Sequence, residues 1–181
     1  DHDQAEACRR HGLEVHMRDA RRVTRETFGP VDAVASLGAF EHFCSPEDYW
    51  AGRQEDVYRE LFANTATTLP EGGRLYLQTM VFGPNMIDPK RVTIDAPRDS
   101  DEWYLALMQH QFPGSWLPFG SEQIVRTAEP HFRLVESSSG RLDYIETIKQ
   151  WRGRFAERSL RKTLLKAELV PRWLTSREFR L

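Results

Sequence analysis

A carboxylate and an imidazole stand directly after a short apolar segment, and this pair is the clearest candidate for chemistry in the sequence. The apolar segment covers residues 31–37, and Glu41 and His42 follow it within a short turn. A nearly continuous apolar run of this length predicts a strand inside a parallel sheet. Open α/β sheets place ligands just beyond the carboxyl ends of such strands. We therefore expect acid–base or ligand-binding chemistry here, with helix capping as the alternative role for Glu41.

The segments on either side of this turn predict alternating helices and strands. We expect a helix at residues 3–11 and a strand at 13–17, where apolar and polar residues alternate. Another helix should begin at Ser45 and continue to about Thr68, followed by a turn and a strand at 74–81. Strands joined through helices by short connections rich in Gly and Pro form βαβ units, which predicts an α/β fold with a mostly parallel sheet.

The second half of the sequence begins with a long irregular excursion. Residues 82–98 are rich in Pro, Asp and Asn and show no regular apolar spacing. The elements expected after it are helices at 100–110 and 120–128, an antiparallel pair of strands at 132–137 and 142–148, a basic helix at 151–169 and a short helix at 171–181.

The composition limits the classes of protein that fit. The chain has 181 residues and a formal net charge of −2, so it fits one domain and lacks the basic excess typical of nucleic-acid binding. Cys8 and Cys44 are its two cysteines, and we expect buried or half-buried thiols rather than a disulfide or a zinc site. No metal site is expected. No apolar run approaches the roughly 20 residues of a membrane span and no signal peptide is visible, which predicts a cytoplasmic protein.

Two motifs resemble those of a known enzyme family. Residues 32–43, DAVASLGAFEHF, resemble the fourth-strand region of class I methyltransferases that use S-adenosylmethionine. They are most similar to the "GAFEHF" pattern of the cyclopropane-fatty-acid and mycolic-acid cyclopropane synthases. Residues 111–118, QFPGSWLP, are similar to the "IFPGGxLP" of the same family. The resemblance extends from about Asp3 to about Trp151.

This resemblance implies a Rossmann-like class I methyltransferase fold, a mostly parallel sheet that closes with an antiparallel pair. The sequence begins at Asp1 without a Met and contains no G-x-G-x-G loop. We therefore expect a fragment that lacks the first two strands of that fold and is itself inactive. Residues 1–151 should form a partial methyltransferase domain, with a lid or acyl-site excursion at about 82–118. Residues 152–181 should form a basic helical segment of the same domain.

The resemblance also implies residues that bind S-adenosylmethionine. Residues 1–5, DHDQA, fit the tail of the family's "LSxNQA" segment, which places Gln4 near the cofactor. Asp19 would face the edge of the adenine, Ala20 would offer a backbone N–H beside it, and Leu37 would pack on the ring. For Asp19, an ordinary acid in a surface turn is the alternative.

For the catalytic site, the resemblance implies a bicarbonate ion that serves as the base and is bound by Glu41. The family's "LHTI" is here Leu77–Met80, so that Gln78 replaces a histidine and Met80 would supply a main-chain N–H. The family's "HYxxTLxxW" is here residues 143–151, so that Tyr144 is kept while its neighbouring histidine is replaced by aspartate. Tyr144 would direct its hydroxyl at the bicarbonate or its ring at a cation.

The substrate side is expected to include His42 and Phe112, with Phe112 lining an acyl pocket. The implied partner is an unsaturated acyl lipid or a carrier-bound acyl chain. Six Lys and Arg residues between Arg152 and Lys166 predict either a solvated helix face or a basic surface for anionic lipid, which would place the protein at the inner membrane surface. An open sheet edge would also permit self-association or strand exchange.

The leading function is therefore methyl transfer from S-adenosylmethionine to an unsaturated fatty-acyl chain, which would give a cyclopropane or a methyl branch. Two alternatives stay open: a methyltransferase for a soluble small molecule, and an inactive or partner-binding fragment.

Overall fold

The computed structural model describes residues 2–176, which divide into two compact units. The first unit extends to Leu134 and the second begins at Val135. Each is described by itself below. The first unit carries the sheet, the hydrophobic core and the Glu41 turn, and the second consists of two helices with the segment that precedes them.

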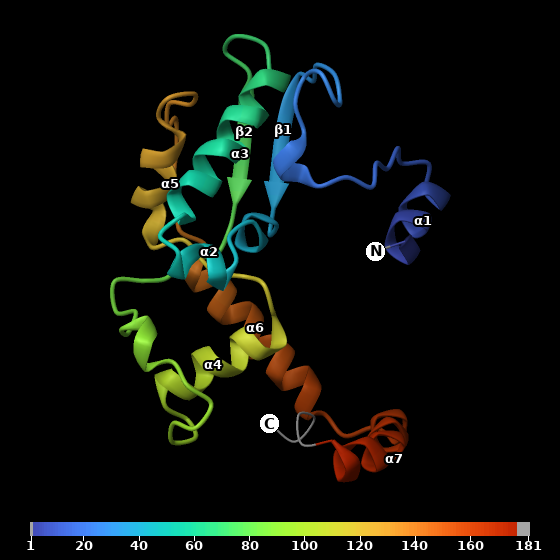
Figure 1. Ribbon diagram of the computed structural model, residues 1–181. Coiled ribbons are helices and arrows are strands. Elements are labelled where there is room, and N and C mark those ends of the chain that lie inside the picture. Colours follow the sequence, from blue (N-terminus) through green and yellow to red (C-terminus); the bar gives the residue numbers. More distant parts are fainter. Residues whose placement is uncertain (1, 177–181) are drawn as a thin grey trace. The chain divides into compact units, whose positions relative to one another are not determined.

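A parallel pair of strands with a helical connection forms the centre of the first unit. Strand β1 (Ala33–Leu37) pairs with β2 (Arg74–Gln78) in a register that runs from Ala33 opposite Arg74 to Leu37 opposite Gln78. The connection contains α2 (Pro46–Trp50) and α3 (Gln54–Thr68), and Figure 1 shows α3 running alongside both strands. This βαβ unit confirms the predicted α/β class and the parallel sheet.

The helix predicted from Ser45 to Thr68 is interrupted, so α2 and α3 are separate. Ser45 caps α2 by accepting a hydrogen bond from the Asp48 N–H at 3.0 Å, and Pro46 stands in its first turn, where a missing N–H costs nothing. Gly52 has a φ of 73°, a conformation that glycine adopts without strain. The chain therefore ends one helix at Trp50 and begins the next at Gln54.

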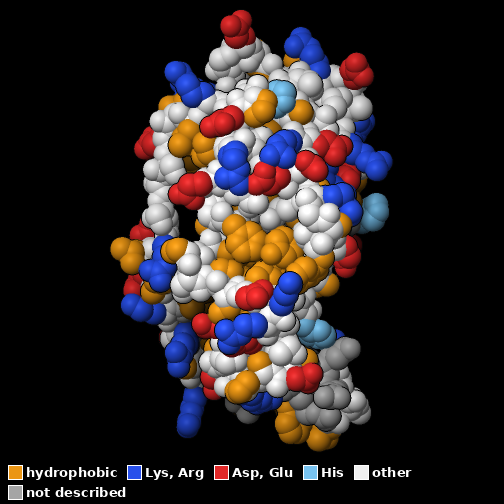
Figure 2. All heavy atoms as spheres, turned by 60° about the vertical axis from the view of Figure 1, so that its left-hand side comes forward, with side chains coloured by type: hydrophobic (Ala, Val, Ile, Leu, Met, Phe, Trp, Pro, Cys, Tyr) orange, Lys and Arg blue, Asp and Glu red, His pale blue; other side chains and the backbone are white. Residues whose placement is uncertain are grey.

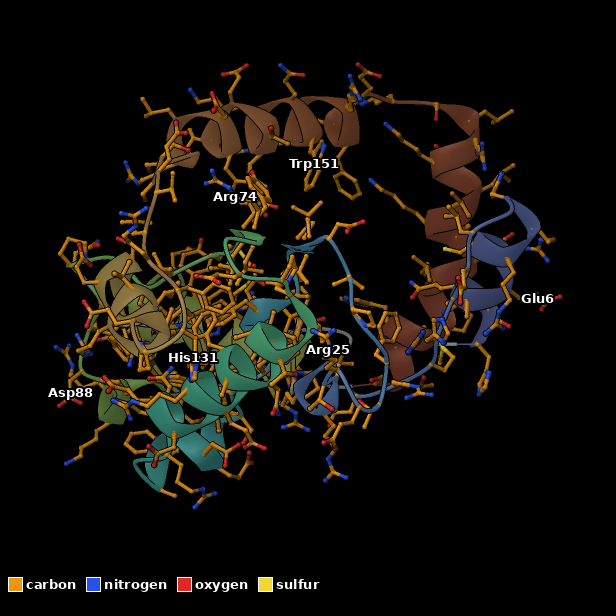
Figure 3. The ribbon with its side chains drawn as sticks, turned by 90° about the horizontal axis from the view of Figure 1, so that it is seen from above. Glu6, Arg25, Arg74, Asp88, His131 and Trp151 are labelled. Atoms are coloured by element: carbon orange, nitrogen blue, oxygen red, sulfur yellow. The ribbon has the colours of Figure 1, made fainter. Side chains whose placement is uncertain are left out.

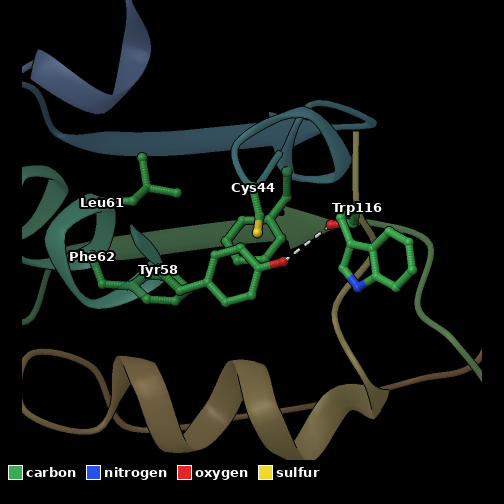
Figure 4. Packing of buried hydrophobic residues seen from close by; sticks show 6 residues of the cluster. Cys44, Tyr58, Leu61, Phe62 and Trp116 are labelled. Carbon is green, nitrogen blue, oxygen red and sulfur yellow. Dashed lines mark hydrogen bonds between the residues drawn. The ribbon is translucent and has the colours of Figure 1, made fainter. Parts of the chain in front are cut away.

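A cluster of aromatic and apolar side chains fills the space beside the sheet. Its fully or nearly fully buried members are Phe40, Cys44, Tyr58, Leu61, Phe62 and Trp116, and Figure 4 shows how they pack. The Tyr58 hydroxyl donates to the Trp116 carbonyl at 3.4 Å, and the Tyr49 ring stacks on the Trp116 ring with 4.4 Å between centroids. These contacts hold the loop that contains Trp116 against α3 and the turn after β1.

The other predicted helices of the first unit are present. They are α1 (His2–Arg10), α4 (Asp101–Gln111) and α5 (Gly120–Ala128), and short 3-10 turns form at η1 (Ala20–Arg22), η2 (Phe40–His42) and η3 (Pro89–Arg91). The irregular excursion after β2 contains η3, and a bridge between Phe82 and Phe119 joins its start to the start of α5.

Ion pairs reinforce the packing of α5 on α3. Arg126 pairs with Glu55, and Glu55 also accepts a hydrogen bond from Arg59 at 2.6 Å. Figure 2 shows the surrounding surface, where basic and acidic side chains are interspersed above a hydrophobic patch. Interspersed charges of this kind give a solvated surface rather than a field of one sign.

The strand predicted at residues 13–17 is wrong. This segment has no regular structure, and Leu13 and Met17 are exposed. A strand is stable only when a neighbour accepts its backbone hydrogen bonds, and no segment within residues 2–176 pairs with this one. The alternating pattern is therefore insufficient by itself. One face of the two-stranded sheet is open, because Leu37 and Tyr76 are each 62 % exposed.

The antiparallel pair predicted at 132–137 and 142–148 is also wrong. The first segment has no strand, and the second lies inside α6 (Arg141–Ala156). Tyr144, Ile148, Trp151 and Phe155 recur at spacings of four, three and four residues, which is the helical period. Their side chains form one apolar stripe, and Figure 3 shows Trp151 on one side of the α6 ribbon.

The basic helix predicted at 151–169 is divided into two. Helix α6 ends at Ala156, and α7 (Leu160–Thr175) begins after Ser159, whose hydroxyl accepts from the Lys162 N–H at 3.3 Å. The predicted break at Pro171 is absent because Pro171 lies within α7. Of the short helix predicted at 171–181, residues 177–181 lie outside the described part of the chain.

Candidate functional site

Glu41 lies in the turn η2, immediately beyond the carboxyl end of β1. Gly38, with a φ of 58°, turns the chain at the strand end, and its N–H donates to the Gln78 carbonyl at 3.0 Å. Phe40 then enters the core and is fully buried. Because Phe40 anchors the turn, the adjacent Glu41 side chain is also drawn inward and is only 4 % exposed.

The two carboxylate oxygens of Glu41 have different surroundings. Oε1 accepts a hydrogen bond from the Met80 N–H at 2.9 Å. Oε2 is buried, and no described residue provides it with a hydrogen-bond partner. A buried oxygen without a partner is costly, and such a group in a native site calls for an explanation. Glu41 is therefore oriented by one oxygen and leaves the other available to a ligand that donates a hydrogen bond.

His42 connects this turn to the loop that follows α4. Its Nδ1 lies 2.6 Å from the hydroxyl of Ser115. The next residue of the loop makes a second contact with the segment after the turn: the backbone N–H of Trp116 donates to the Cys44 carbonyl at 2.8 Å. The structure thus brings the predicted residues Glu41, His42 and Met80 together, and it adds Ser115, which the sequence did not single out.

The other residues predicted for the catalytic and substrate sides lie on several different elements. Gln78 is the last residue of β2, and its side chain is exposed. The Met80 N–H was expected to serve a bicarbonate ion, whereas in the structure it binds Glu41. Phe112 caps the carboxyl end of α4 and is 51 % exposed. Tyr144 lies in α6 and belongs to the second unit, so its proposed role stays a prediction.

A pocket of about 480 Å³ lies along β1 and contains two of the predicted cofactor residues, Ala20 and Leu37. Its walls come from both strands, from η1 and η2, and from α3. The lining is mainly apolar, as in many pockets that accept flat ring systems. The roles of Ala20 and Leu37 at the adenine of S-adenosylmethionine stay predictions, and the described residues show no glycine loop for its methionine end.

Asp19 and Gln4 are the other predicted cofactor residues, and neither lines this pocket. Asp19 caps η1 and accepts hydrogen bonds from the Arg21 backbone at 3.0 Å and from its guanidinium at 2.9 Å. The hydrogen bond from the Arg21 side chain lowers the pKa of Asp19. Gln4 lies in α1. In this structure the Asp19 carboxylate caps a turn, and its role at the cofactor stays a prediction.

Cys44 is buried in the core and Cys8 is exposed, so the expectation of two buried thiols is correct for Cys44 alone. Burial raises the pKa of Cys44 to about 12. Among residues 2–176, no cluster of three His, Cys, Asp or Glu side chains is arranged to hold a metal ion. No helix in the same range has the length and apolarity needed to cross a membrane.

The parallel βαβ unit with a buried acid beyond β1 defines a protein of the α/β class with its site at the carboxyl end of the sheet. A family model described as mycolic acid cyclopropane synthetase matches residues 2–175. The chain belongs to this family, whose members are S-adenosylmethionine-dependent methyltransferases with the class I fold.

Individual relatives carry names from the same family. The chain is similar to cyclopropane mycolic acid synthase 3 of Mycobacterium tuberculosis, with 30% identity over 122 residues, which covers 67% of this chain and 39% of the relative. It is also similar to cyclopropane mycolic acid synthase 2 of Mycobacterium leprae, with 27% identity over 67% of this chain and 38% of the relative. The matched region therefore spans about two fifths of the length of these curated relatives.

Proposed function

We propose that this protein transfers a methyl group from S-adenosylmethionine to an unsaturated fatty-acyl chain of a lipid. The observation that carries the proposal is the buried Glu41, oriented by the Met80 N–H and with Oε2 unpaired, at the carboxyl end of β1. Membership of the family and the names of the relatives support the same reaction class. The product would be a cyclopropane ring or a methyl branch.

The chemistry requires a base close to the acyl chain. When bound, S-adenosylmethionine supplies an electrophilic methyl group, which one alkene carbon takes up as the carbon–sulfur bond breaks, leaving a neutral thioether and a cationic second alkene carbon. Ring closure then joins that carbon to the new carbon as a proton leaves. Glu41 Oε2 is suited to accept a hydrogen bond from hydrogencarbonate, which would receive this proton.

Other residues take supporting roles in this proposal. Ala20 and Leu37 would contact the adenine through the pocket along β1. Phe112 and His42 would border the acyl chain. A wider set of predicted residues keeps its proposed roles: Gln4 and Asp19 at the cofactor, and Gln78 and Tyr144 at the base.

The test uses the full-length protein with methyl-labelled S-adenosylmethionine and vesicles of an unsaturated phospholipid. The proposal predicts label in the acyl chains. Label in a water-soluble product with none in the lipid would refute the lipid acceptor while keeping the methyltransferase class.

A soluble acceptor is the second candidate, and one observation favours it. Gln78 stands where the related motif has histidine, and its exposed amide can donate a hydrogen bond but cannot carry a charge. If this loss has redirected the enzyme, Gln78→His would restore lipid alkylation. If Gln78 already serves the lipid reaction, the same variant would leave lipid alkylation unchanged or lower it.

The second unit supplies a candidate surface for the lipid. Between Lys149 and Arg172 the chain has eight Lys or Arg residues and two Glu residues. The same helices expose large apolar side chains, including Trp151, Phe155 and Trp173. Basic amphipathic helices of this type bind anionic membrane surfaces. We therefore propose that the reaction takes place at the inner membrane surface and that the helices of the second unit contact the lipid.

A further inference from the structure

The loop between α4 and α5 has two halves that are held differently. Its second half is buried and firmly attached: the Trp116 N–H donates to Cys44, the Leu117 carbonyl accepts from the Gln54 side chain at 2.9 Å, and the Pro118 carbonyl accepts from the Phe82 N–H at 2.8 Å. Because these bonds involve backbone atoms of the loop, its second half keeps its path independently of most of its side chains.

The first half of the loop is exposed. Phe112, Pro113 and Gly114 are all on the surface, and Gly114 turns the chain with a φ of 82°. Ser115 lies at the boundary between the halves and is only partly exposed. Its hydroxyl contacts His42 Nδ1 at 2.6 Å, a short distance for a hydrogen bond between a side-chain oxygen and a nitrogen.

This contact spans 73 residues of sequence and joins two functional segments. On one side stands the turn that carries Glu41, and on the other the turn that carries Phe112. The motif that this loop resembles has glycine where this chain has Ser115, so the hydroxyl is a feature of this chain and not of the motif.

We propose that the hydrogen bond between His42 and Ser115 is a clasp that positions the exposed turn Phe112–Gly114 beside the Glu41 turn and so sets how the acceptor enters the site. Both are positioning residues in this role. The identity of the acceptor in this proposal rests on the proposed function. The effect of the hydrogen bond on the loop does not depend on any reaction.

A serine beside a histidine also occurs in enzymes with a nucleophilic serine. In those sites the base is in turn oriented by a third group. Among the described residues, no hydrogen bond joins a carboxylate to His42, whose ring contacts Ser115 instead. The geometry therefore favours positioning over nucleophilic attack by Ser115.

NMR relaxation of the backbone amides of the full-length protein tests the clasp directly. Ser115→Ala and His42→Phe each remove one partner, so the order parameters of the amides at positions 114 and 115 are expected to fall from about 0.85 toward about 0.6. Ser115→Thr and His42→Asn keep a polar group at the contact and should keep the order parameters of the parent. The order parameters of Trp116 and Leu117 should not change, and Ser138→Ala, at an exposed serine of the second unit, is the matched control.

Kinetics provide the second measurement. Ser115→Ala should raise the KM for the lipid acceptor about three- to tenfold and leave the KM for the cofactor unchanged, and Ser115→Thr should restore the parent value. An unchanged order parameter at Gly114, or an equal rise in both KM values, would overturn the clasp. Loss of kcat with trapping of an acyl group on Ser115 would instead show a nucleophile. If the parent transfers no methyl group to lipid, the proposed function fails, and the NMR order parameters still decide the clasp.

Discussion

Glu41 is held by two constraints that come from different parts of the chain. Phe40 fixes the turn from the core side, and the Met80 N–H fixes Oε1 from the end of β2. The unpaired Oε2 makes this carboxylate the leading candidate for a ligand contact, since most buried polar atoms in proteins have a hydrogen-bond partner. Glu41 is accordingly the residue whose chemistry can be tested most selectively.

Replacing Glu41 by glutamine should lower methyl transfer by about a hundredfold or more, the usual effect of losing a positioned base, because the hydrogencarbonate ion loses the group that holds it. The amide oxygen can still accept from Met80, but an NH2 group in the place of Oε2 donates hydrogen bonds and cannot accept one from hydrogencarbonate. The measurement is the rate of label transfer. Glu47→Gln, at an exposed position in α2, is the matched control. Equal rates for both variants would remove Glu41 from the mechanism.

Part of this site could be predicted from the sequence. Glu41 and His42 were recognisable because they follow the apolar segment that forms β1, and Met80 because residues 77–80 match the "LHTI" motif of the family. The role of Ser115 was hidden, since a contact between residues 42 and 115 depends on the tertiary path of the loop. The one sign of this role in the sequence is a serine at a position where the family motif has glycine. The partner of the Met80 N–H was also unpredictable, because a neighbouring side chain and an ion can compete for the same donor.

At the scale of elements, a buried network of amides joins α3, α5 and the Trp116 loop. Gln54 donates to Tyr58 at 3.0 Å and to the Leu117 carbonyl at 2.9 Å, and it accepts from Gln123 at 3.2 Å. Gln123 in turn accepts from the Phe119 N–H at 2.7 Å. Networks of this kind are stabilising only while every member is satisfied.

Gln54→Ala should therefore lower the free energy of unfolding by about 2–3 kcal/mol, because it removes the Gln54 hydrogen bonds to the Leu117 carbonyl and the Gln123 side chain and one of the two hydrogen bonds of the Tyr58 hydroxyl. Urea denaturation followed by tryptophan fluorescence measures this loss. Gln150→Ala, at an exposed position in α6, should cost less than about 0.5 kcal/mol. Similar losses for the two variants would show that the network contributes little.

Asp48 gives α2 a dependence on pH. The hydrogen bond from Arg53, at 2.7 Å, lowers the pKa of Asp48. A lowered pKa means that its contribution is complete above the unfolded value of about 4 and is lost as the pH falls through the folded value. Because Arg53 is largely exposed, we expect Asp48→Asn to cost only about 0.5 kcal/mol at pH 7.

Below about pH 4 this difference between the parent and Asp48→Asn should fade. Urea denaturation at a series of pH values measures it, with Asp32→Asn, at an exposed position, as the control. A difference that grows as the pH falls would contradict the assigned direction.

The helices and strands were predictable where local signals agreed with tertiary packing. Helices α1, α4 and α5 and both strands appear close to the expected positions. The prediction of a strand at 13–17 was wrong because no described segment pairs with these residues. The strand at 142–148 failed because its alternation was only apparent: Ile148, Trp151 and Phe155 continue a helical stripe that becomes visible over a longer window.

At the scale of the molecule, the second unit differs in character from the first. The first has a buried core around Phe40 and Trp116, whereas the large apolar side chains of the second, Trp151 and Phe155 among them, remain exposed. Exposed apolar stripes on basic helices gain free energy from an anionic membrane surface.

The full-length protein should therefore bind vesicles containing phosphatidylglycerol at least about tenfold more tightly than vesicles of phosphatidylcholine alone, and added salt should weaken this preference. Co-sedimentation measures the binding. Trp151→Ala should weaken it severalfold, and Gln150→Ala, the neighbouring residue outside the apolar stripe, should not. Binding to neutral vesicles with equal affinity would exclude the electrostatic part of this proposal.

The most direct test of the central claim is the destination of the methyl group. The full-length protein is incubated with methyl-labelled S-adenosylmethionine and unsaturated phospholipid vesicles, and the released fatty acids are analysed by mass spectrometry. The predicted result is an acyl chain that has gained one labelled carbon at the former double bond, as a ring or a branch, with loss of this product in Glu41→Gln. An unmodified acyl chain, with the label in a water-soluble compound, would contradict the claim.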